Sequence, residues 1–183
     1  MNLPNKLTVA RIVLVPFFVF FLLTDILPAS KLLALIVFVL ASVTDALDGH
    51  IARSRNLVTT FGKFLDPLAD KVLVISALVC FIELGTVSSV PVLIIIAREF
   101  MVSGLRLVTA DKGVVVPANI WGKLKTAFTM VTIVLILFAH AFGLTWGWVG
   151  IAETVLIWIS TVLTVISGWT YLDAYKDYIK AEM

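Results

Sequence analysis

Four aspartates lie close together between residues 45 and 70 of a chain in which 61% of the residues are hydrophobic. Asp45 and Asp48 are three residues apart, and Asp66 and Asp70 are four residues apart, so each pair would share one face of a helix. Two such helices side by side would gather four carboxylates, and a bound cation would relieve their repulsion. Oxygen ligands suit hard divalent ions such as Mg²⁺, Mn²⁺ or Ca²⁺, and no Cys or His is spaced to suggest zinc. The aspartates therefore predict a carboxylate-bound divalent metal site.

The aspartates belong to a longer motif, in which D-x-x-D-G-x-x-A-R is followed, after eight residues, by G-x-x-x-D-x-x-x-D. This motif resembles the signature of the CDP-alcohol phosphotransferase family. A lone D-x-x-D would be a weak signal, whereas agreement at every fixed position across the whole span is specific. The fixed positions are Asp45, Asp48, Gly49, Ala52, Arg53, Gly62, Asp66 and Asp70.

The resemblance implies a metal-dependent transfer reaction on a CDP-linked lipid. An alcohol hydroxyl would attack the lipid-side phosphorus, and CMP would leave. The resemblance assigns Asp45, Asp48 and Asp66 as the main ligands of Mg²⁺ or Mn²⁺, with two ions expected, and these ions would neutralise the diphosphate. Asp70 is the expected general base, and a role for Asp70 as a further metal ligand stays open.

Small residues beside the aspartates are expected, within this motif, to line the CDP-lipid site. Gly49 has no side chain and Ala52 lies one turn after Asp48, so a base or phosphate could approach the helix backbone. Arg53 could bind the diphosphate in bidentate fashion, and Gly62 is expected to permit the turn into the third helix. Outside the motif, close helix packing would be the preferred explanation for such small residues.

The first residues form the pattern N-x-P-N-x-L-T-x-x-R, in which Pro4 suits the first turn of a helix and Asn2 or Asn5 could cap it. This stretch predicts a short interfacial helix that leads into the first membrane segment. The pattern also resembles the opening of phosphatidylglycerophosphate synthases, a branch of the same family, in which this segment lies near the nucleotide. The resemblance therefore makes Asn5 and Arg11 candidates for contact with the CDP-lipid.

Charged residues also interrupt apolar sequence in the second half of the chain. Arg98 and Glu99 lie deep in an apolar segment, so we expect them to face the interior of the helix bundle and to pair. Arg106 lies eight residues after Arg98, on about the same side of the helix, and Lys123 and Lys125 follow. The positive-inside rule alone could explain the lysines. Together, however, the four cations predict a pocket for an anionic acceptor.

The same half contains A-R-E-F-x-V-S-G-L-R and G-K-x-K-T, two patterns that again resemble phosphatidylglycerophosphate synthases. The implied donor is CDP-diacylglycerol, and the implied acceptor is sn-glycerol 3-phosphate. The acceptor phosphate would be bound by Arg98, Arg106, Lys123 and Lys125. The expected products are phosphatidylglycerol phosphate and CMP, so the chain is expected to act in phospholipid biosynthesis.

Composition predicts that this chemistry takes place in a membrane. Only 14% of the residues are charged, against about 25% in soluble domains, and the mean hydropathy is +1.09. The length of 183 residues predicts a single domain, 1–183. Its apolar segments predict an all-α fold, that of a polytopic membrane protein with six transmembrane helices and the short N-terminal interfacial helix. The six apolar segments are Leu7–Leu27, Leu32–Ile51, Pro67–Leu84, Val87–Val108, Thr126–Trp146 and Trp148–Leu172.

The positions of the basic residues predict the orientation in the membrane. With six spans both termini lie on one side, and all of the 14 Lys and Arg residues except Lys31 and Arg98 fall on that side. Under the positive-inside rule, both termini and the stretch 45–70 face the cytoplasm, so the expected location is the cytoplasmic membrane. The apolar residues after Lys6 and Arg11 could also form a signal peptide, although a first membrane helix explains them equally well.

Other functions stay open at this point. A relative with another acceptor alcohol, such as inositol phosphate or serine, would share the same signature. A divalent-cation transporter could use intramembrane aspartates to line its path, whereas a non-catalytic scaffold would leave their cost unexplained. A homodimer is expected from the resemblance alone, and no nucleic-acid partner is expected. The single cysteine, Cys80, rules out an internal disulfide and is expected to be a small buried hydrophobe.

Overall fold

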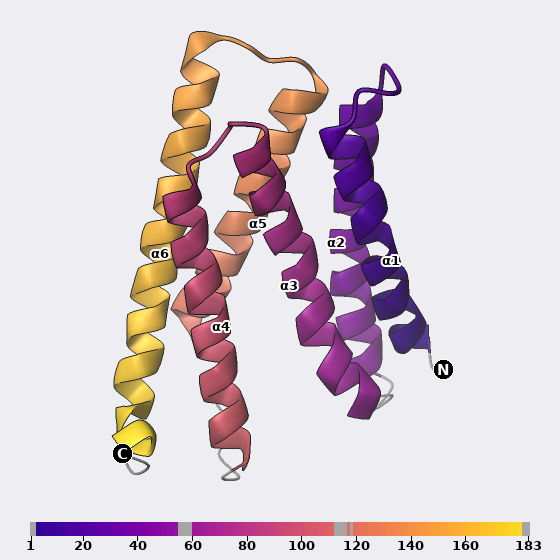
Figure 1. Ribbon diagram of the computed structural model, residues 1–183. Coiled ribbons are helices and arrows are strands. Elements are labelled where there is room, and N and C mark those ends of the chain that lie inside the picture. The colour runs from indigo at the N-terminus through magenta and orange to yellow at the C-terminus, as the bar shows by residue number, and fades with distance from the viewer. Residues whose placement is uncertain (1–2, 55–59, 112–116, 118, 181–183) are drawn as a thin grey trace. The chain divides into compact units, whose positions relative to one another are not determined.

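The computed structural model describes the backbone of residues 3–54, 60–111, 117 and 119–180 and the side chains of residues 5–44, 68, 69, 71–107, 109, 117 and 119–176. Every regular element in these described ranges is an α-helix, which confirms the predicted all-α class. In chain order the helices are α1 (Leu3–Leu23), α2 (Ser30–Ser54), α3 (Thr60–Glu83), α4 (Ser89–Asp111), α5 (Ile120–Ala141) and α6 (Gly147–Lys180) (Figure 1).

Each predicted apolar segment overlaps one of these helices, but several predicted ends were wrong. The third segment was expected to begin at Pro67, whereas α3 begins at Thr60. A proline favours the first helical turn, but membrane helices also tolerate a proline further along. The first segment was expected to end at Leu27, whereas α1 ends at Leu23.

The separate N-terminal interfacial helix predicted from the sequence is not formed by the described residues, because α1 runs without a break from Leu3 to Leu23. Pro4 lies in the first turn, where a missing amide proton costs no helical hydrogen bond. No glycine or proline stands between residues 5 and 15, so nothing in the sequence ends the helix before its apolar stretch.

Among the residues with described side chains, three stretches are long and apolar enough to cross a membrane: Asn5–Leu23, Ile120–Ala141 and Gly147–Lys176. The apolar part of α2, Ser30–Thr44, is shorter. A span needs about 20 mainly apolar residues, so composition and these stretches together identify an integral membrane protein. The six crossings predicted from the sequence stay a prediction.

The last helix continues well beyond its predicted end at Leu172. Its 34 residues correspond to about 51 Å of helix, against about 30 Å for the hydrocarbon core of a bilayer. Near its end, Lys176 Nζ lies 2.9 Å from Asp173 Oδ1, and both side chains are exposed. The charged residues at this end therefore extend α6 beyond the apolar segment as a solvated helix.

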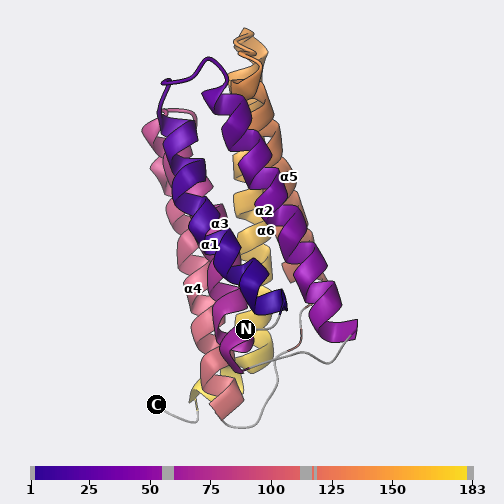
Figure 2. The same cartoon turned by 90° about the vertical axis from the view of Figure 1, so that its right-hand side faces the viewer.

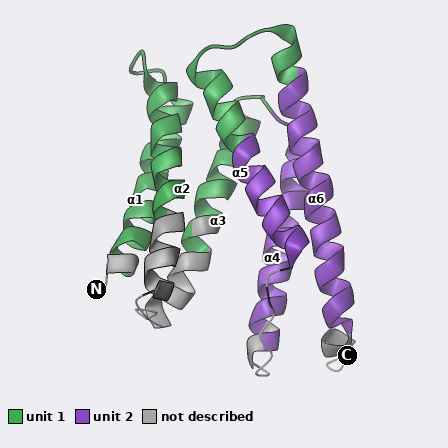
Figure 3. Ribbon diagram, turned by 180° about the vertical axis from the view of Figure 1, so that it is seen from behind, with its two compact units in different colours: residues 1–86, 133–150 green, residues 87–132, 151–183 purple. Residues whose placement is uncertain are grey.

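The chain divides into two compact units, which share α5 and α6 (Figure 3). Unit 1 comprises residues 1–86 and 133–150, and in it α1 packs against both α2 and α3 (Figure 2). The rings of Phe18 in α1 and Phe38 in α2 lie 5.5 Å apart at the centre of this packing. Buried alanines let the helix backbones approach closely. They are Ala34, Ala41, Ala69 and Ala77.

Two polar side chains inside unit 1 have partners within the helical packing. Arg11 is buried, and its Nε donates to the carbonyl oxygen of Ala41 in α2 at 3.2 Å. His140 Nε2 lies 3.0 Å from Thr86 Oγ1. Cys80 is buried, as the sequence predicted, so it behaves as a packing residue.

Unit 2 comprises residues 87–132 and 151–183, and therefore contains α4, the first part of α5 and most of α6. Buried hydroxyl groups from α5 and α6 form much of its polar interior: Thr129, Thr132, Ser160, Thr161, Thr164 and Ser167. Thr132 Oγ1 and Ser160 Oγ lie 3.4 Å apart and join the two helices. Small hydroxyl residues are common where membrane helices pack.

Candidate functional site

The signature aspartates lie on two helices of unit 1. Asp45 and Asp48 belong to α2, and Asp66 and Asp70 belong to α3. Because both helices are continuous here, the spacing places the members of each pair on one side of their helix. The four side chains lie outside the described residues, so their convergence and the metal site stay predictions.

The part of the chain whose side chains are described contains no group of three or more His, Cys, Asp or Glu that could hold a metal ion. The metal prediction therefore depends on the signature aspartates. Their donor set fits such an ion, because four carboxylates offer only hard oxygen ligands.

The residues predicted to line the CDP-lipid site lie on the same helices and on α1. Gly49, Ala52 and Arg53 fall in the last two turns of α2, with their side chains outside the described residues. Gly62 lies inside the first turn of α3, which begins at Thr60, and its expected role in the turn into this helix stays a prediction. Asn5 is buried, at 7% exposure, in the first turns of α1.

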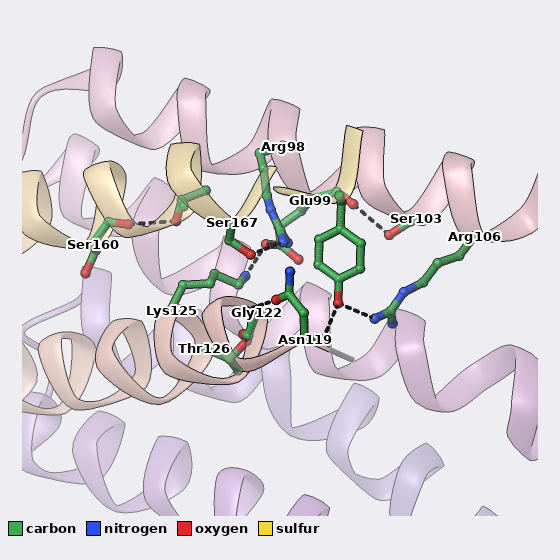
Figure 4. A network of polar contacts seen from close by, with 12 residues as sticks. Arg98, Glu99, Ser103, Arg106, Asn119, Gly122, Lys125, Thr126, Ser160 and Ser167 are labelled. Atoms are coloured by element: carbon green, nitrogen blue, oxygen red, sulfur yellow. Dashed lines mark hydrogen bonds and ion pairs between the residues drawn. The ribbon is translucent and has the colours of Figure 1, made fainter. Parts of the chain in front are cut away.

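The predicted pairing of Arg98 and Glu99 is confirmed. Arg98 Nη1 lies 3.1 Å from Glu99 Oε1, and Lys125 Nζ from α5 pairs with the same oxygen (Figure 4). The side chains of Arg98 and Lys125 are 8% and 9% exposed, and that of Glu99 is 16% exposed. Arg98 Nη2 also donates to Ser167 Oγ at 2.6 Å. α4 and α5 therefore meet at one partly buried carboxylate, and α6 joins them through Arg98.

Among the described side chains, the charges of this cluster do not cancel. One carboxylate, Glu99, faces two buried cations, Arg98 and Lys125. A buried charge is costly unless an opposite charge or a set of hydrogen bonds compensates it. The cluster therefore favours an additional anion. Arg106 and Lys123, the two other predicted phosphate ligands, are exposed.

Tyr171 of α6 is a member of this network that the sequence did not predict. It is buried, at 3% exposure, and its hydroxyl oxygen accepts from Arg106 Nη2 at 3.0 Å and from the backbone amide of Asn119 at 3.0 Å. The hydroxyl donates to the carbonyl oxygen of Pro117 at 3.3 Å. A buried tyrosine needs partners for its hydroxyl, but sequence alone does not say which residues supply them.

The start of α5 is tied to α6 by a second unpredicted residue. Asn119 precedes the helix, and its Oδ1 accepts from the backbone amide of Gly122 at 2.6 Å, which is an N-terminal cap. Asn119 Nδ2 donates to Thr170 Oγ1 at 2.9 Å. A Cβ atom on Gly122 would lie 3.2 Å from both Asn119 Oδ1 and Tyr171 Oη, so this position accommodates little more than glycine.

The comparisons with known proteins agree along nearly the whole chain. A model of the CDP-alcohol phosphatidyltransferase family matches residues 1–166. A Bacillus subtilis protein named CDP-diacylglycerol–glycerol-3-phosphate 3-phosphatidyltransferase is 42% identical and aligns over 98% of this chain and 97% of its own length. Proteins with the same name from Rickettsia typhi and Escherichia coli are 44% and 39% identical, over 97% and 96% of this chain and 98% and 95% of their own lengths.

Proposed function

We infer that this chain, which belongs to the CDP-alcohol phosphatidyltransferase family, transfers the phosphatidyl group of CDP-diacylglycerol to sn-glycerol 3-phosphate. The products are phosphatidylglycerol phosphate and CMP, and the reaction belongs to phospholipid biosynthesis. The observation that carries this inference is the match to relatives of that named activity over nearly the full length of both chains. This match favours an enzyme over a cation transporter.

Enzymes of this family generally use divalent metal ions. For this chain we propose two ions, Mg²⁺ or Mn²⁺, held by Asp45, Asp48 and Asp66. When bound, such ions would neutralise the donor diphosphate and its leaving group. Asp70 would take the proton from the acceptor hydroxyl as that oxygen attacks the lipid-side phosphorus, or would act as a further ligand. The acidic donor set on α2 and α3 supports these roles.

We propose that the CDP part of the donor binds beside Gly49 and Ala52, where the absence of large side chains lets a flat base or a phosphate lie against α2. Arg53, at the end of α2, would bind the diphosphate through paired hydrogen bonds. Gly62 in α3 and Asn5 in α1 would complete this part of the site.

We propose that the acceptor phosphate binds to Arg98, Arg106, Lys123 and Lys125. The excess of buried positive charge among the described side chains around Glu99 supports this assignment, because an incoming phosphate would compensate it. Arg98 and Lys125 are held by Glu99 and contribute mainly charge. Arg106 and Lys123 are exposed and can donate directly to a ligand.

We also propose four further properties of the protein. They are a single functional domain over residues 1–183, six membrane crossings, a site on the cytoplasmic side together with both termini, and a homodimer. The distribution of Lys and Arg supports the orientation.

An acceptor-competition assay tests the proposed function. Purified protein in detergent micelles is given labelled CDP-diacylglycerol with equal concentrations of sn-glycerol 3-phosphate, inositol phosphate and serine. We expect phosphatidylglycerol phosphate as the dominant lipid product. A preference for inositol phosphate or serine would overturn the assignment of the acceptor.

A further inference from the structure

We propose that Tyr171 is a positioning residue for the acceptor: its hydroxyl holds the Arg106 guanidinium in the orientation that binds the acceptor phosphate. This inference rests on the proposed function. Tyr171 lies beyond residues 1–166, the part of the chain that the family model matches, and in a helix end otherwise marked by solvated charges. Neither the signature nor the family match therefore assigns it a role.

The contrast in exposure between the two residues supports the proposal. Arg106 is exposed at the side of α4, whereas Tyr171 is buried. An exposed arginine loses substantial rotamer freedom when it binds a ligand, unless a neighbour already restricts it. The 3.0 Å bond from Arg106 Nη2 to Tyr171 Oη provides such a restriction from a fixed position.

The hydroxyl of Tyr171 is fully used by the protein. A tyrosine hydroxyl has one proton to donate and two lone pairs to accept. Arg106 and the amide of Asn119 use the lone pairs, and the carbonyl oxygen of Pro117 takes the proton. Tyr171 therefore acts through Arg106 and is not itself a ligand of the substrate.

The ring of Tyr171 contributes separately from the hydroxyl. The guanidinium carbons of Arg98 and Arg106 each lie 5.5 Å from the ring centroid, within the range of cation–π attraction. A phenylalanine at this position would keep both ring contacts and lose only the hydrogen bonds. Tyr171→Phe is therefore the variant that isolates the hydroxyl.

The test compares wild type, Tyr171→Phe, Arg106→Ala and the double variant in steady-state assays of both substrates. For Tyr171→Phe we expect the KM for sn-glycerol 3-phosphate to rise about tenfold, the lower end for loss of a hydrogen bond to a charged group. The KM for CDP-diacylglycerol should stay within a factor of about two. In the double variant, loss of the hydroxyl should add nothing to Arg106→Ala, because Tyr171 acts through that arginine.

Ser160→Ala is the matched control, since it removes another buried hydroxyl of α6, which contacts Thr132 and none of the arginines whose side chains are described. It should leave both KM values unchanged. A merely structural role for Tyr171 would instead lower kcat, affect both substrates and add to the effect of Arg106→Ala. That pattern, or an unchanged KM for the acceptor in Tyr171→Phe, overturns the proposal.

Failure of this inference can be distinguished from failure of the proposed function. If wild type does not use sn-glycerol 3-phosphate, the function is wrong. If it does, but Arg106→Ala leaves the acceptor KM unchanged, the role of Arg106 is wrong and that of Tyr171 with it. Should Tyr171→Phe not accumulate, Tyr171→3,5-difluorotyrosine, assayed at a pH low enough to keep its more acidic hydroxyl protonated, keeps the hydroxyl and weakens it as an acceptor. A rise of about twofold in the acceptor KM is then expected, a fraction of the full loss, and no rise overturns the proposal.

Discussion

The signature region of α2 and α3 and the charged network of unit 2 use charge in different ways. The signature places four aspartates within 26 residues and carries one arginine, Arg53, among its fixed positions. The network instead sets Glu99 between Arg98 and Lys125 and holds Arg106 with a neutral tyrosine. In the first region the proposed compensation comes from bound metal ions, whereas in the second most of it comes from the protein.

This difference separates two kinds of functional residue. Uncompensated like charges are costly to fold and are retained where a ligand neutralises them, so substitutions there should affect the chemistry more than stability. Residues of a network in which the protein supplies most of the compensation support one another, so substitutions there should affect stability and acceptor binding together.

The largest expected effect is from Asp70→Asn in the signature. The change keeps the shape of the side chain but removes its charge and its ability to accept a proton. We expect turnover to fall by about 10²–10⁴-fold, the usual contribution of a general base, with the melting temperature almost unchanged. Asp25→Asn is the control, since Asp25 lies in the connection before α2 and pairs only at the surface with Lys31. Full turnover by Asp70→Asn would contradict the proposed role.

The next largest effect is expected from Glu99→Gln in the network. The change leaves Arg98 and Lys125 buried without their shared carboxylate. We expect the free energy of unfolding to fall by about 3 kcal/mol, as when one partner of a buried ion pair is removed. Thermal unfolding in detergent measures this loss. Unchanged stability would mean that Glu99 does not compensate the charges of Arg98 and Lys125.

Whether a contact of this network could be predicted depends on how far apart its two residues lie in the sequence. Arg98 and Glu99 are neighbours in an apolar segment, so their pairing could be predicted from burial alone. Lys125 lies 26 residues from Glu99, and Tyr171 lies 65 residues from Arg106, so those contacts depend on how three helices pack. Likewise, hydropathy located all six helices, but it could not decide whether Pro67 begins α3 or lies within it.

A smaller effect is expected from Gly122→Ala. The added methyl group would lie 3.2 Å from Asn119 Oδ1 and Tyr171 Oη, so these groups must move slightly. We expect the KM for sn-glycerol 3-phosphate to rise about threefold, a fraction of what losing one hydrogen bond would produce. Gly104→Ala on α4 is the control, because its added Cβ meets no atom within 4 Å. Gly104→Ala should leave KM unchanged and stabilise the helix by about 1 kcal/mol.

The smallest effect is expected from Asp173→Asn, which removes the exposed pair with Lys176. An ion pair at the surface contributes little, so the free energy of unfolding should change by less than about 0.5 kcal/mol. The same thermal measurement used for Glu99→Gln gives the comparison directly. A loss of stability as large as that for Glu99→Gln would show that an exposed ion pair contributes as much here as a buried one.

The most direct test of the central claim is the release of CMP from CDP-diacylglycerol by the purified protein. We predict that CMP appears only when sn-glycerol 3-phosphate and Mg²⁺ or Mn²⁺ are both present, together with an equal amount of phosphatidylglycerol phosphate. Removal of divalent ions with a chelator should stop the reaction, and their return should restore it. CMP release that continues without divalent ions, or without any lipid product from the acceptor, would contradict the account.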